Sequence, residues 1–558
     1  MSTTITQKAP PMKRRLSLLA SPAALLLTVL AHAAAPGISG TGAAVTFNLT
    51  ASPAFISQPD GQSVYSWGYG CTGGTLGTGQ SFVPAMPSVT AFCNTMQVPG
   101  PTLVVTQGQT VNVVLTNGLP GAAGNTSILF PGFNVSTSCS ASTPVGVQGL
   151  LTCEAAPSGT VTYTFTAATP GTRAYYSGTQ GDLQVEMGLY GAIIVLPSAA
   201  PTTANGGACP AKNNAAGLNT AGTALVSGGE RDFRLNANGN AYGLHQSCYD
   251  REYLFQFSEM DPNIHSQALA QVTAIAGCTT GVAGNTCPTT LNVPTEPYRP
   301  AYFMINGRSM PDDMDTNYAA QYPHQPYNGN PHMHPGDMVL LRIIGQGRWQ
   351  HPFHEHGNHV RILARDGNLI TSTSSATQLA GPLLFTTTTT PGLAMDGIFY
   401  WTGRGLNWDA YGHNASSSDP LATLTCTPDG NGYNTGNLTA VNYYEWCQDH
   451  NKPLEGKPFG DVGGGGPVTL PQANLFTNGA WFGGSPYLGP DATIRAVGPT
   501  GTTPPSGTIA NPPTSEAGFA FMWHSHNERE ITTNNIFPGG MLMMMLVDSR
   551  EFVIDESQ

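Results

Sequence analysis

Short segments in which apolar and polar residues alternate recur along most of the chain after residue 34. Residues 161–166 alternate apolar side chains with Thr, and residues 110–115 follow a similar pattern. A period of two is typical of an antiparallel strand with one buried face. Residues 188–195 are almost all apolar or Gly and predict a fully buried strand, and turns rich in Gly and Pro separate such segments. The pattern therefore predicts an all-β protein.

The strand-like segments fall into two groups, which predict two domains. Residues 34–200 form the first and residues 245–558 the second, and their evenly spaced strands favour Greek-key β-sandwiches or barrels with long loops. Residues 201–244 are rich in Gly, Asn and Ala and predict a linker or long loop. Residues 403–517 contain few strand patterns and predict an insertion in the second domain. Such an insertion either covers a site or contacts a partner, or it is a disordered tether.

The first 33 residues predict a signal peptide. Lys13, Arg14 and Arg15 precede an apolar run over residues 16–30, and the Ala-His-Ala at 31–33 is typical of a cleavage site. No later stretch is apolar over a span long enough to cross a bilayer. We therefore expect a secreted, periplasmic or cell-surface protein.

The charge balance bears on which partners the chain can bind. Charged residues make up only 10% of the chain, with 33 acidic side chains against 21 basic ones. The predicted leader holds four of the basic residues and no acidic one, so its removal makes the net charge more negative than −12. Such a surface repels phosphate backbones, and we expect no nucleic-acid partner.

Ten cysteines in a chain that is expected to be exported predict disulfide bonds. Cysteines that are neighbours in sequence make plausible pairs, such as Cys139 with Cys153 and Cys278 with Cys287. No cysteine lies beside the histidine motifs. We therefore interpret all ten as structural.

Two segments concentrate the histidines. Residues 351–359 read His-Pro-Phe-His-Glu-His-Gly-Asn-His, and residues 523–526 read Trp-His-Ser-His. In a strand, residues two positions apart project from the same face, so each His-x-His unit presents two imidazoles side by side. Two such strands brought together place four imidazoles around one space. Nitrogen donors of this kind favour copper, zinc or nickel over calcium or magnesium.

The order of these motifs resembles the C-terminal copper signature of the multicopper oxidases. Residues 98–103, 170–172 and 188–191 also resemble the family's first domain, and residues 306–308 and 364–367 resemble its later strands. The resemblance implies two cupredoxin-like domains that cover most of the chain. It also implies an oxidase. In this family a type 1 copper, held by a Cys, two His and usually a Met, passes electrons to a trinuclear copper cluster held by eight His, where oxygen becomes water.

The resemblance assigns roles to individual residues. His351 matches a type 1 ligand, and Met541 matches the axial Met. One or two copper ions are the cofactor that this partial set implies. Four positions match ligands of the trinuclear cluster: His354, His356, His524 and His526.

The chain departs from the family at several ligand positions. In the first domain, the two His-x-His units fall at residues 129–131 and 176–178, which read Leu-Phe-Pro and Tyr-Ser-Gly. Ser525 stands where the family has the type 1 Cys, and Glu530 stands near its second type 1 His. A hydroxyl is no substitute for a soft thiolate. We therefore expect a first domain without metal ligands and no standard type 1 copper.

A second alignment stays open. Residues 354–357 and 524–526 also resemble the two His-x-His pairs of an ordinary first domain of the family, which never carries the Cys. Under this alignment the second domain offers half of a trinuclear cluster, and another copy or a partner chain completes it. His351 favours the first alignment and Ser525 the second.

Three further residues lie close enough to the motifs to bind the metal or to surround its ligands: His359, Glu528 and Glu530. Each has a structural alternative, because His359 could cap a neighbouring strand and the glutamates could be solvated loop charges.

The sequence leaves two functions open. The first is a copper-binding oxidase or oxidase subunit, whose substrates in this family include reduced metal ions and phenols. The second is a non-catalytic protein that holds copper or has a structural role at the cell surface. The first domain without ligands and the missing Cys favour the second.

Overall fold

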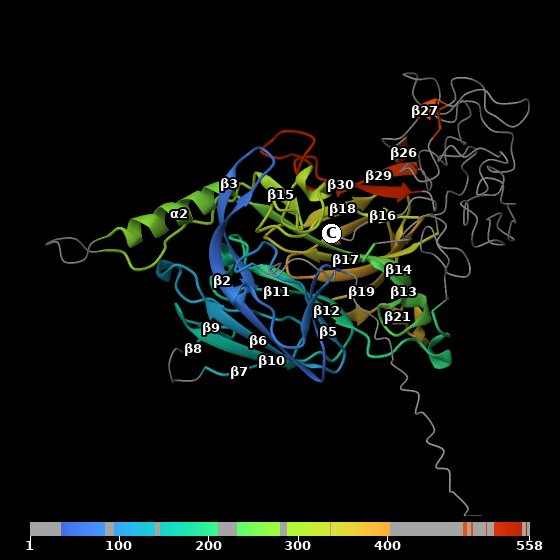
Figure 1. Cartoon of the computed structure of the whole chain (residues 1–558), viewed down its shortest axis with the longest axis horizontal. Helices are drawn as coiled ribbons and strands as arrows, with labels where there is room; N and C mark the ends of the chain where they lie inside the picture. The colour runs from blue at the N-terminus through green and yellow to red at the C-terminus, as the bar shows by residue number, and fades with distance from the viewer. Residues whose placement is uncertain are drawn as a thin grey trace, which may run out of the picture. The chain divides into compact units, whose positions relative to one another are not determined.

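The computed structural model describes residues 35–83, 94–139, 146–209, 232–278, 287–334, 336–401 and 518–548, together with 484–487, 493–494, 509–510 and 554. The predicted signal peptide and most of the predicted insertion lie outside these residues. The structure is mostly β, as the alternation of apolar and polar residues predicts, and Figure 1 shows the strands gathered into sheets. No helix in the described ranges has the length and apolar character needed to cross a bilayer.

Two five-stranded sheets form the first sandwich. Sheet 1 has the order β11 (Gly171–Tyr176), β12 (Tyr190–Leu196), β5 (Leu103–Thr106), β1 (Gly37–Gly40) and β4 (Gln80–Val83). Sheet 2 has the order β3 (Ser63–Cys71), β2 (Ala44–Ser57), β6 (Thr110–Asn117), β10 (Thr160–Thr166) and β7 (Ser136–Thr137). Alternate residues of both sheets, such as Val113, Tyr163 and Ile193, fill one core between them.

The second sandwich is built from two larger sheets. Sheet 3 has the order β13 (Leu235–Asn240), β14 (Cys248–Met260), β17 (Met338–Gly345), β25 (Ala394–Tyr400), β19 (Val360–Arg365) and β20 (Asn368–Leu369), with β15 (Tyr302–Ile305) paired to β14 and β23 (Leu383–Leu384) to β19. Sheet 4 has the order β16 (His332–Met333), β30 (Leu542–Asp548), β29 (Gly518–Ser525), β18 (His351–Glu355) and β24 (Thr386–Thr389), with β26 (Gly484–Tyr487) paired to β29. Phe255, Phe353 and Trp523 belong to the core between these sheets.

Two boundaries differ from the sequence-based expectation. β13 lies within residues 201–244, which we expected to be a linker, and it pairs with β14. The segment Leu235–Asn240 reads Leu-Asn-Ala-Asn-Gly-Asn, so it lacks the apolar alternation that signals a strand. β26 likewise lies within the expected insertion and extends sheet 4 through pairing with β29. The two expected disulfides, Cys139–Cys153 and Cys278–Cys287, are present, and Cys209–Cys248 adds a third.

The two sandwiches meet through the outer faces of sheets 1 and 3. Val104 and Ile194 of sheet 1 pack with Leu254 and Ile344 of sheet 3 in a shared apolar cluster. Sheet 4 covers the opposite face of sheet 3, because its apolar side chains belong to the core between those two sheets. The outer face of sheet 4 therefore points away from the first domain.

A buried charge network crosses the interface between sheets 1 and 3. The Arg342 guanidinium lies 3.3 Å from Glu252 and 3.6 Å from Asp396, with side chains at most 1% exposed. Thr172 of the first domain donates to Asp396 from its amide (3.1 Å) and its hydroxyl (2.6 Å). The interface therefore combines apolar packing with buried polar contacts.

We predict that Arg342→Met destabilises the protein by about 3–5 kcal/mol, because it leaves two carboxylates buried without their cation. The free energy of unfolding, measured in urea, checks the prediction. The matched control is Arg365→Met on the exposed face of β19, which should change stability by no more than about 0.5 kcal/mol. Equal losses for both variants would contradict the prediction.

Candidate metal centre

The candidate site is built on the antiparallel pairing of β18 and β29. His354 lies directly opposite His524 in this register, and Phe353 lies opposite Ser525. Because side chains alternate across a strand, Phe353 enters the core while His354 takes the outer face of sheet 4. Two backbone bonds extend the pairing beyond its ends: His526 N donates to Pro352 O (2.7 Å) and His356 N to Met522 O (3.3 Å).

The pairing brings the four expected imidazoles together. The ring centroids of His354 lie 4.8 Å from His356, 4.9 Å from His526 and 5.6 Å from His524. His356 and His524 are 5.2 Å apart, and their Nε2 atoms approach to 3.3 Å. Two imidazole nitrogens bound at about 2.0–2.1 Å to one tetrahedral ion would be about 3.3 Å apart. His356 and His524 thus already have the spacing of a ligand pair.

The four imidazoles do not by themselves form a complete ligand set in this structure. Among the described residues, no three His, Cys, Asp or Glu side chains have donor atoms arranged to hold one ion. The site is therefore a group of four imidazoles in which only His356 and His524 already have the spacing of two ligands to one ion.

The protonation of two rings suits metal binding. His524 Nδ1 lies 2.7 Å from the carbonyl oxygen of Ser525, which can only accept, so the proton resides on Nδ1 and Nε2 keeps its lone pair. Burial, followed by the nearby His356, His524 and His526, lowers the pKa of His354 to about 4. Burial also lowers the pKa of His524. Both rings are therefore neutral at pH 7, the form that binds a metal.

The other candidate residues take different positions. His359 is exposed, and the centroid of its ring lies 5.2 Å from that of Phe385. The Phe385 ring centroid lies 5.6 Å from that of His354. Glu528 is exposed and interacts electrostatically with His524. Met541 is fully buried in the core between sheets 3 and 4. These positions put His359 and Glu528 at the edge of the imidazole cluster and Met541 on the other side of the sheet.

His351, which the resemblance matches to a type 1 ligand, does not lie with the four imidazoles on the outer face of sheet 4. It shares the core side of β18 with Phe353, and its two ring nitrogens lie 2.9 Å from Glu259 and 2.9 Å from Glu530. A neutral imidazole has one N–H, so two bonds to carboxylates require the imidazolium form. Burial alone lowers the pKa of His351, but the bonds to Glu259 and Glu530 outweigh it and raise the pKa to about 9. Both nitrogens are therefore donors and neither is free to bind a metal.

Glu259 is a site residue that the sequence analysis missed. It is 2% exposed and lies in β14 between Ser258 and Met260. A carboxylate within an otherwise buried strand is a signal that could have been noticed, since such a group needs a partner. Its partner, His351, is 92 residues away, and nothing in the sequence links the two.

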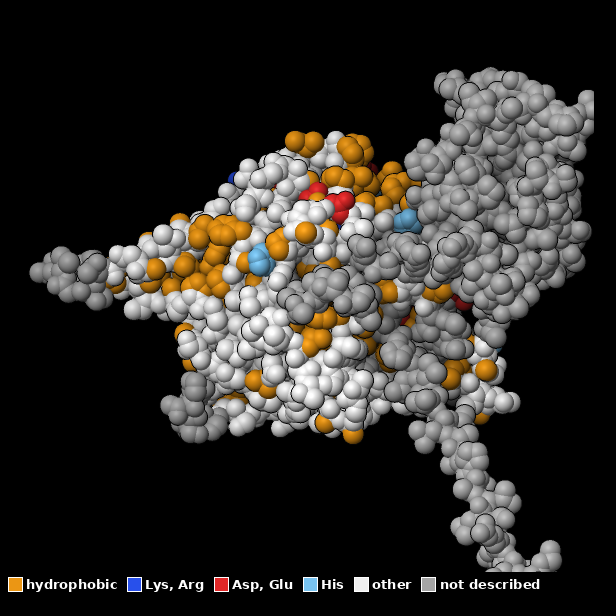
Figure 2. All heavy atoms as spheres, viewed as in Figure 1, with side chains coloured by type: hydrophobic (Ala, Val, Ile, Leu, Met, Phe, Trp, Pro, Cys, Tyr) orange, Lys and Arg blue, Asp and Glu red, His pale blue; other side chains and the backbone are white. Residues whose placement is uncertain are grey.

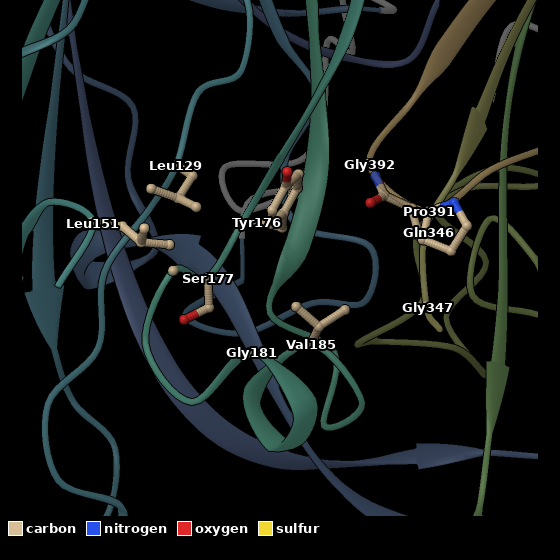
Figure 3. A pocket seen from close by; sticks show the side chains of 11 residues that line it. Leu129, Leu151, Tyr176, Ser177, Gly181, Val185, Gln346, Gly347, Pro391 and Gly392 are labelled. Carbon is tan, nitrogen blue, oxygen red and sulfur yellow. The ribbon is translucent and has the colours of Figure 1, made fainter. Parts of the chain in front are cut away.

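A pocket of ≈ 330 Å³ lies at the first-domain positions of the family's His-x-His units, of which Leu129, Tyr176, Ser177 and Gly178 line it. Figure 3 shows Leu129, Tyr176 and Ser177 on one side of it and Gln346 and Gly392 on the other. Ser177 Oγ already donates to Gln184, and Gln346 Nε2 already donates to Gly191 O and Gln256. These lining groups offer no imidazole, thiolate or carboxylate.

The side chains present suit one kind of copper site and not the other. Four imidazoles on the outer face of sheet 4 suit copper as a nitrogen-bound ion. At the type 1 position, Ser525 has no thiolate, Glu530 replaces an imidazole, and His351 is held between carboxylates. The residues present do not fit a type 1 copper.

Comparison with known proteins gives a consistent picture. Two segments match family models described as multicopper oxidase, over residues 81–200 and 294–394. The second segment contains His354 and His356. No curated protein sequence matches the chain.

Several solved structures are similar to this chain at low identity. A multicopper oxidase, mgLAC, is 14% identical with a TM-score of 0.41, and the match covers 91% of this chain and 87% of that one. The blue copper oxidase from Nitrosomonas europaea is 14% identical with a TM-score of 0.41, covering 90% and 86%. The copper nitrite reductase from the same organism is 16% identical with a TM-score of 0.34, covering 64% and 85%.

We predict a pH dependence of stability that originates at His351. The pKa of the His351 imidazole in the folded protein, about 9, lies above its ordinary value of 6.5. The protonated ring therefore stabilises the fold fully below pH 6.5, by on the order of 3 kcal/mol, and this contribution is lost as the pH rises through 9. Urea unfolding of the wild type and of His351→Gln at pH 6 and pH 10 checks the prediction. The stability difference between the two proteins should be larger at pH 6, and a difference that does not change with pH would contradict it.

Proposed function

Two segments of the chain match multicopper oxidase domains, and from this premise we propose that it is an exported copper-binding protein. It is either an oxidase or a subunit of one, and it works without a type 1 copper. The observation that carries the proposal is the group of four imidazoles on the outer face of sheet 4. Two neighbouring strands supply them, and two of their Nε2 atoms are 3.3 Å apart. Fold alone would not imply function, so the proposal rests on these side chains.

In this proposal the imidazoles of β18 and β29 hold one or two copper ions. Copper bound there would supply one-electron redox chemistry or simply be stored. The chain's own contribution is placement: Trp523 Nε1 donates to His356 O (2.9 Å), and the Thr386 hydroxyl lies 2.7 Å from His354 Nδ1. Phe385 gives one edge of the cluster an exposed aromatic ring. The substrate would be a small molecule, such as a phenol, or a reduced metal ion.

The direction of the imidazole face bears on how the site is completed. The first domain packs on the outer face of sheet 3, whereas the imidazoles lie on the outer face of sheet 4. The chain's own first domain is therefore on the wrong side of the second sandwich to supply further ligands. This supports a second copy or a partner chain as the source of any additional ligands.

Export is part of the proposal. The basic and apolar pattern of residues 1–33 supports it, as do three disulfides among the described residues. On the face seen in Figure 2, Lys and Arg side chains are scarce over the described part of the chain. This agrees with the acidic balance of the sequence.

A second candidate function is a non-catalytic protein that holds copper or has a structural role. The residues at the type 1 position favour it, because Ser525 and Glu530 remove the family's usual electron entry. The pocket at the first-domain positions favours it too, since Leu129 and Tyr176 stand where imidazoles would be needed.

We predict that His354→Ala combined with His524→Ala abolishes copper binding, because the change removes one imidazole from each strand. Copper per chain after dialysis, determined by elemental analysis, checks this. His359→Ala is the matched control and should keep wild-type copper, since its ring contacts Phe385. Full copper loading of the double variant would remove the site assignment.

We predict that the copper-loaded wild type has no intense blue absorption, because no thiolate is available at Ser525. Visible absorption and electron spin resonance check this. Oxygen consumption with Fe(II), Mn(II) or a phenol then separates the two candidate functions. Consumption that disappears in the double variant supports the oxidase, whereas none with any of the three supports the copper-holding protein.

A further inference from the structure

The core side of β18 and β29 carries a cluster of buried polar groups, directly behind the imidazole face. We call Glu259, His351, Ser525 and Glu530 the ionic cluster. The Ser525 hydroxyl donates to Glu530 Oε2, the same oxygen that lies 2.9 Å from His351 Nδ1. Three groups thus meet at one atom. All four residues are at most 2% exposed.

The ionic cluster joins elements that are distant in the sequence. Glu259 is near the end of β14 in sheet 3, and His351 begins β18 in sheet 4. Ser525 ends β29, and Glu530 follows in the next turn. Asn527 Nδ2 donates to Glu530 Oε1 (2.9 Å). The cluster therefore links the two sheets of the second sandwich beside the strands that carry the imidazoles.

Further donors hold the Glu259 end of the cluster. Glu259 Oε1 accepts hydrogen bonds from the backbone amides of Arg348 (2.6 Å) and Trp349 (2.8 Å) and from the Tyr298 hydroxyl (3.2 Å). The Tyr298 oxygen also lies 2.6 Å from Glu186 in the first domain. The Arg348 guanidinium lies 4.1 Å from the centre of the Tyr298 ring. Hydrogen bonds thus run from the first domain through Tyr298 to the ionic cluster.

The backbone around Met541 fixes the Glu530 end. Met541 N donates to Glu530 O (2.8 Å), and its carbonyl accepts from Ser525 N (2.9 Å). Met541 therefore lies next to both residues, where the family's axial ligand would be expected. The four family positions, His351, Ser525, Glu530 and Met541, are brought together in space although two of them no longer carry metal ligands.

We infer that the ionic cluster takes the place of a type 1 copper: the His351 imidazolium bridges two carboxylates where a metal cation would otherwise bind, and it clamps β14, β18 and β29 together without one. The inference rests on the proposed function only for the choice of copper as the metal. Its physical basis is competition between a proton and a metal. Both ring nitrogens carry protons that are bonded to carboxylates, so a metal would have to displace a proton and break a buried ion pair.

The test uses the full chain with His354→Ala and His524→Ala, so that copper on the imidazole face does not contribute. We call this the starting protein. It should show no copper that depends on His351. Adding Ser525→Cys and Glu530→His places a thiolate and a second imidazole beside His351. This variant should gain one Cu(II) per chain and an intense visible absorption band, the signature of a His₂Cys site. Ser525→Ala with Glu530→His is the matched control and should lack the intense band.

Two results would overturn the inference. One is copper in the starting protein that disappears on adding His351→Gln, since the position would then be open to metal. The other is a folded Ser525→Cys/Glu530→His variant, verified by a cooperative unfolding transition, that shows no thiolate-to-copper band. If that variant fails to fold, the His351→Gln comparison in the starting protein still decides. If the starting protein binds copper and His351→Gln does not change the amount, the assignment of His354 and His524 as copper ligands is wrong. The inference that the ionic cluster does not bind copper is then supported.

Discussion

The register between β18 and β29 is the constraint on which the candidate site depends. Placing His354 opposite His524 puts all four imidazoles on one face of sheet 4 and puts His351, Phe353 and Ser525 on the other. A shift of one residue in either strand would move its imidazoles into the apolar core. The buried aromatic side chains of Phe353 and Trp523 oppose such a shift, because they would have to move to the outer face. The core therefore holds the imidazole face in place.

Histidines on the two faces of sheet 4 differ in protonation. On the outer face, burial and neighbouring rings keep His354 neutral, with a pKa of about 4. On the core face, two carboxylates keep His351 protonated, with a pKa of about 9. The residues are three positions apart in one strand, so local sequence does not cause the difference. The groups that face each ring from neighbouring elements cause it.

The arrangement of the sandwiches limits what the chain can do by itself. The first domain contacts sheet 3, and the imidazoles project from the far side of sheet 4. The residues at the first-domain ligand positions line a pocket without imidazole, thiolate or carboxylate. The family's two-domain arrangement of ligands is thus absent from the described residues for two independent reasons, side-chain identity and direction. An oxidase built on this chain would have to complete its site from elsewhere, whereas a copper-holding protein would not.

The sequence by itself determined the all-β class, two of the disulfides and the two histidine pairs whose four imidazoles the structure brings together. These follow from local patterns: alternation reports one buried face, and His-x-His in a strand fixes two side chains on one side. Sequence could not identify β13, whose Asn-rich segment is a strand only because β14 pairs with it. Nor could it reveal Glu259 as the partner of His351, or the direction of the imidazole face. Those properties depend on which elements pack against which, and contacts between residues 92 or 179 positions apart leave no periodic signal in the chain.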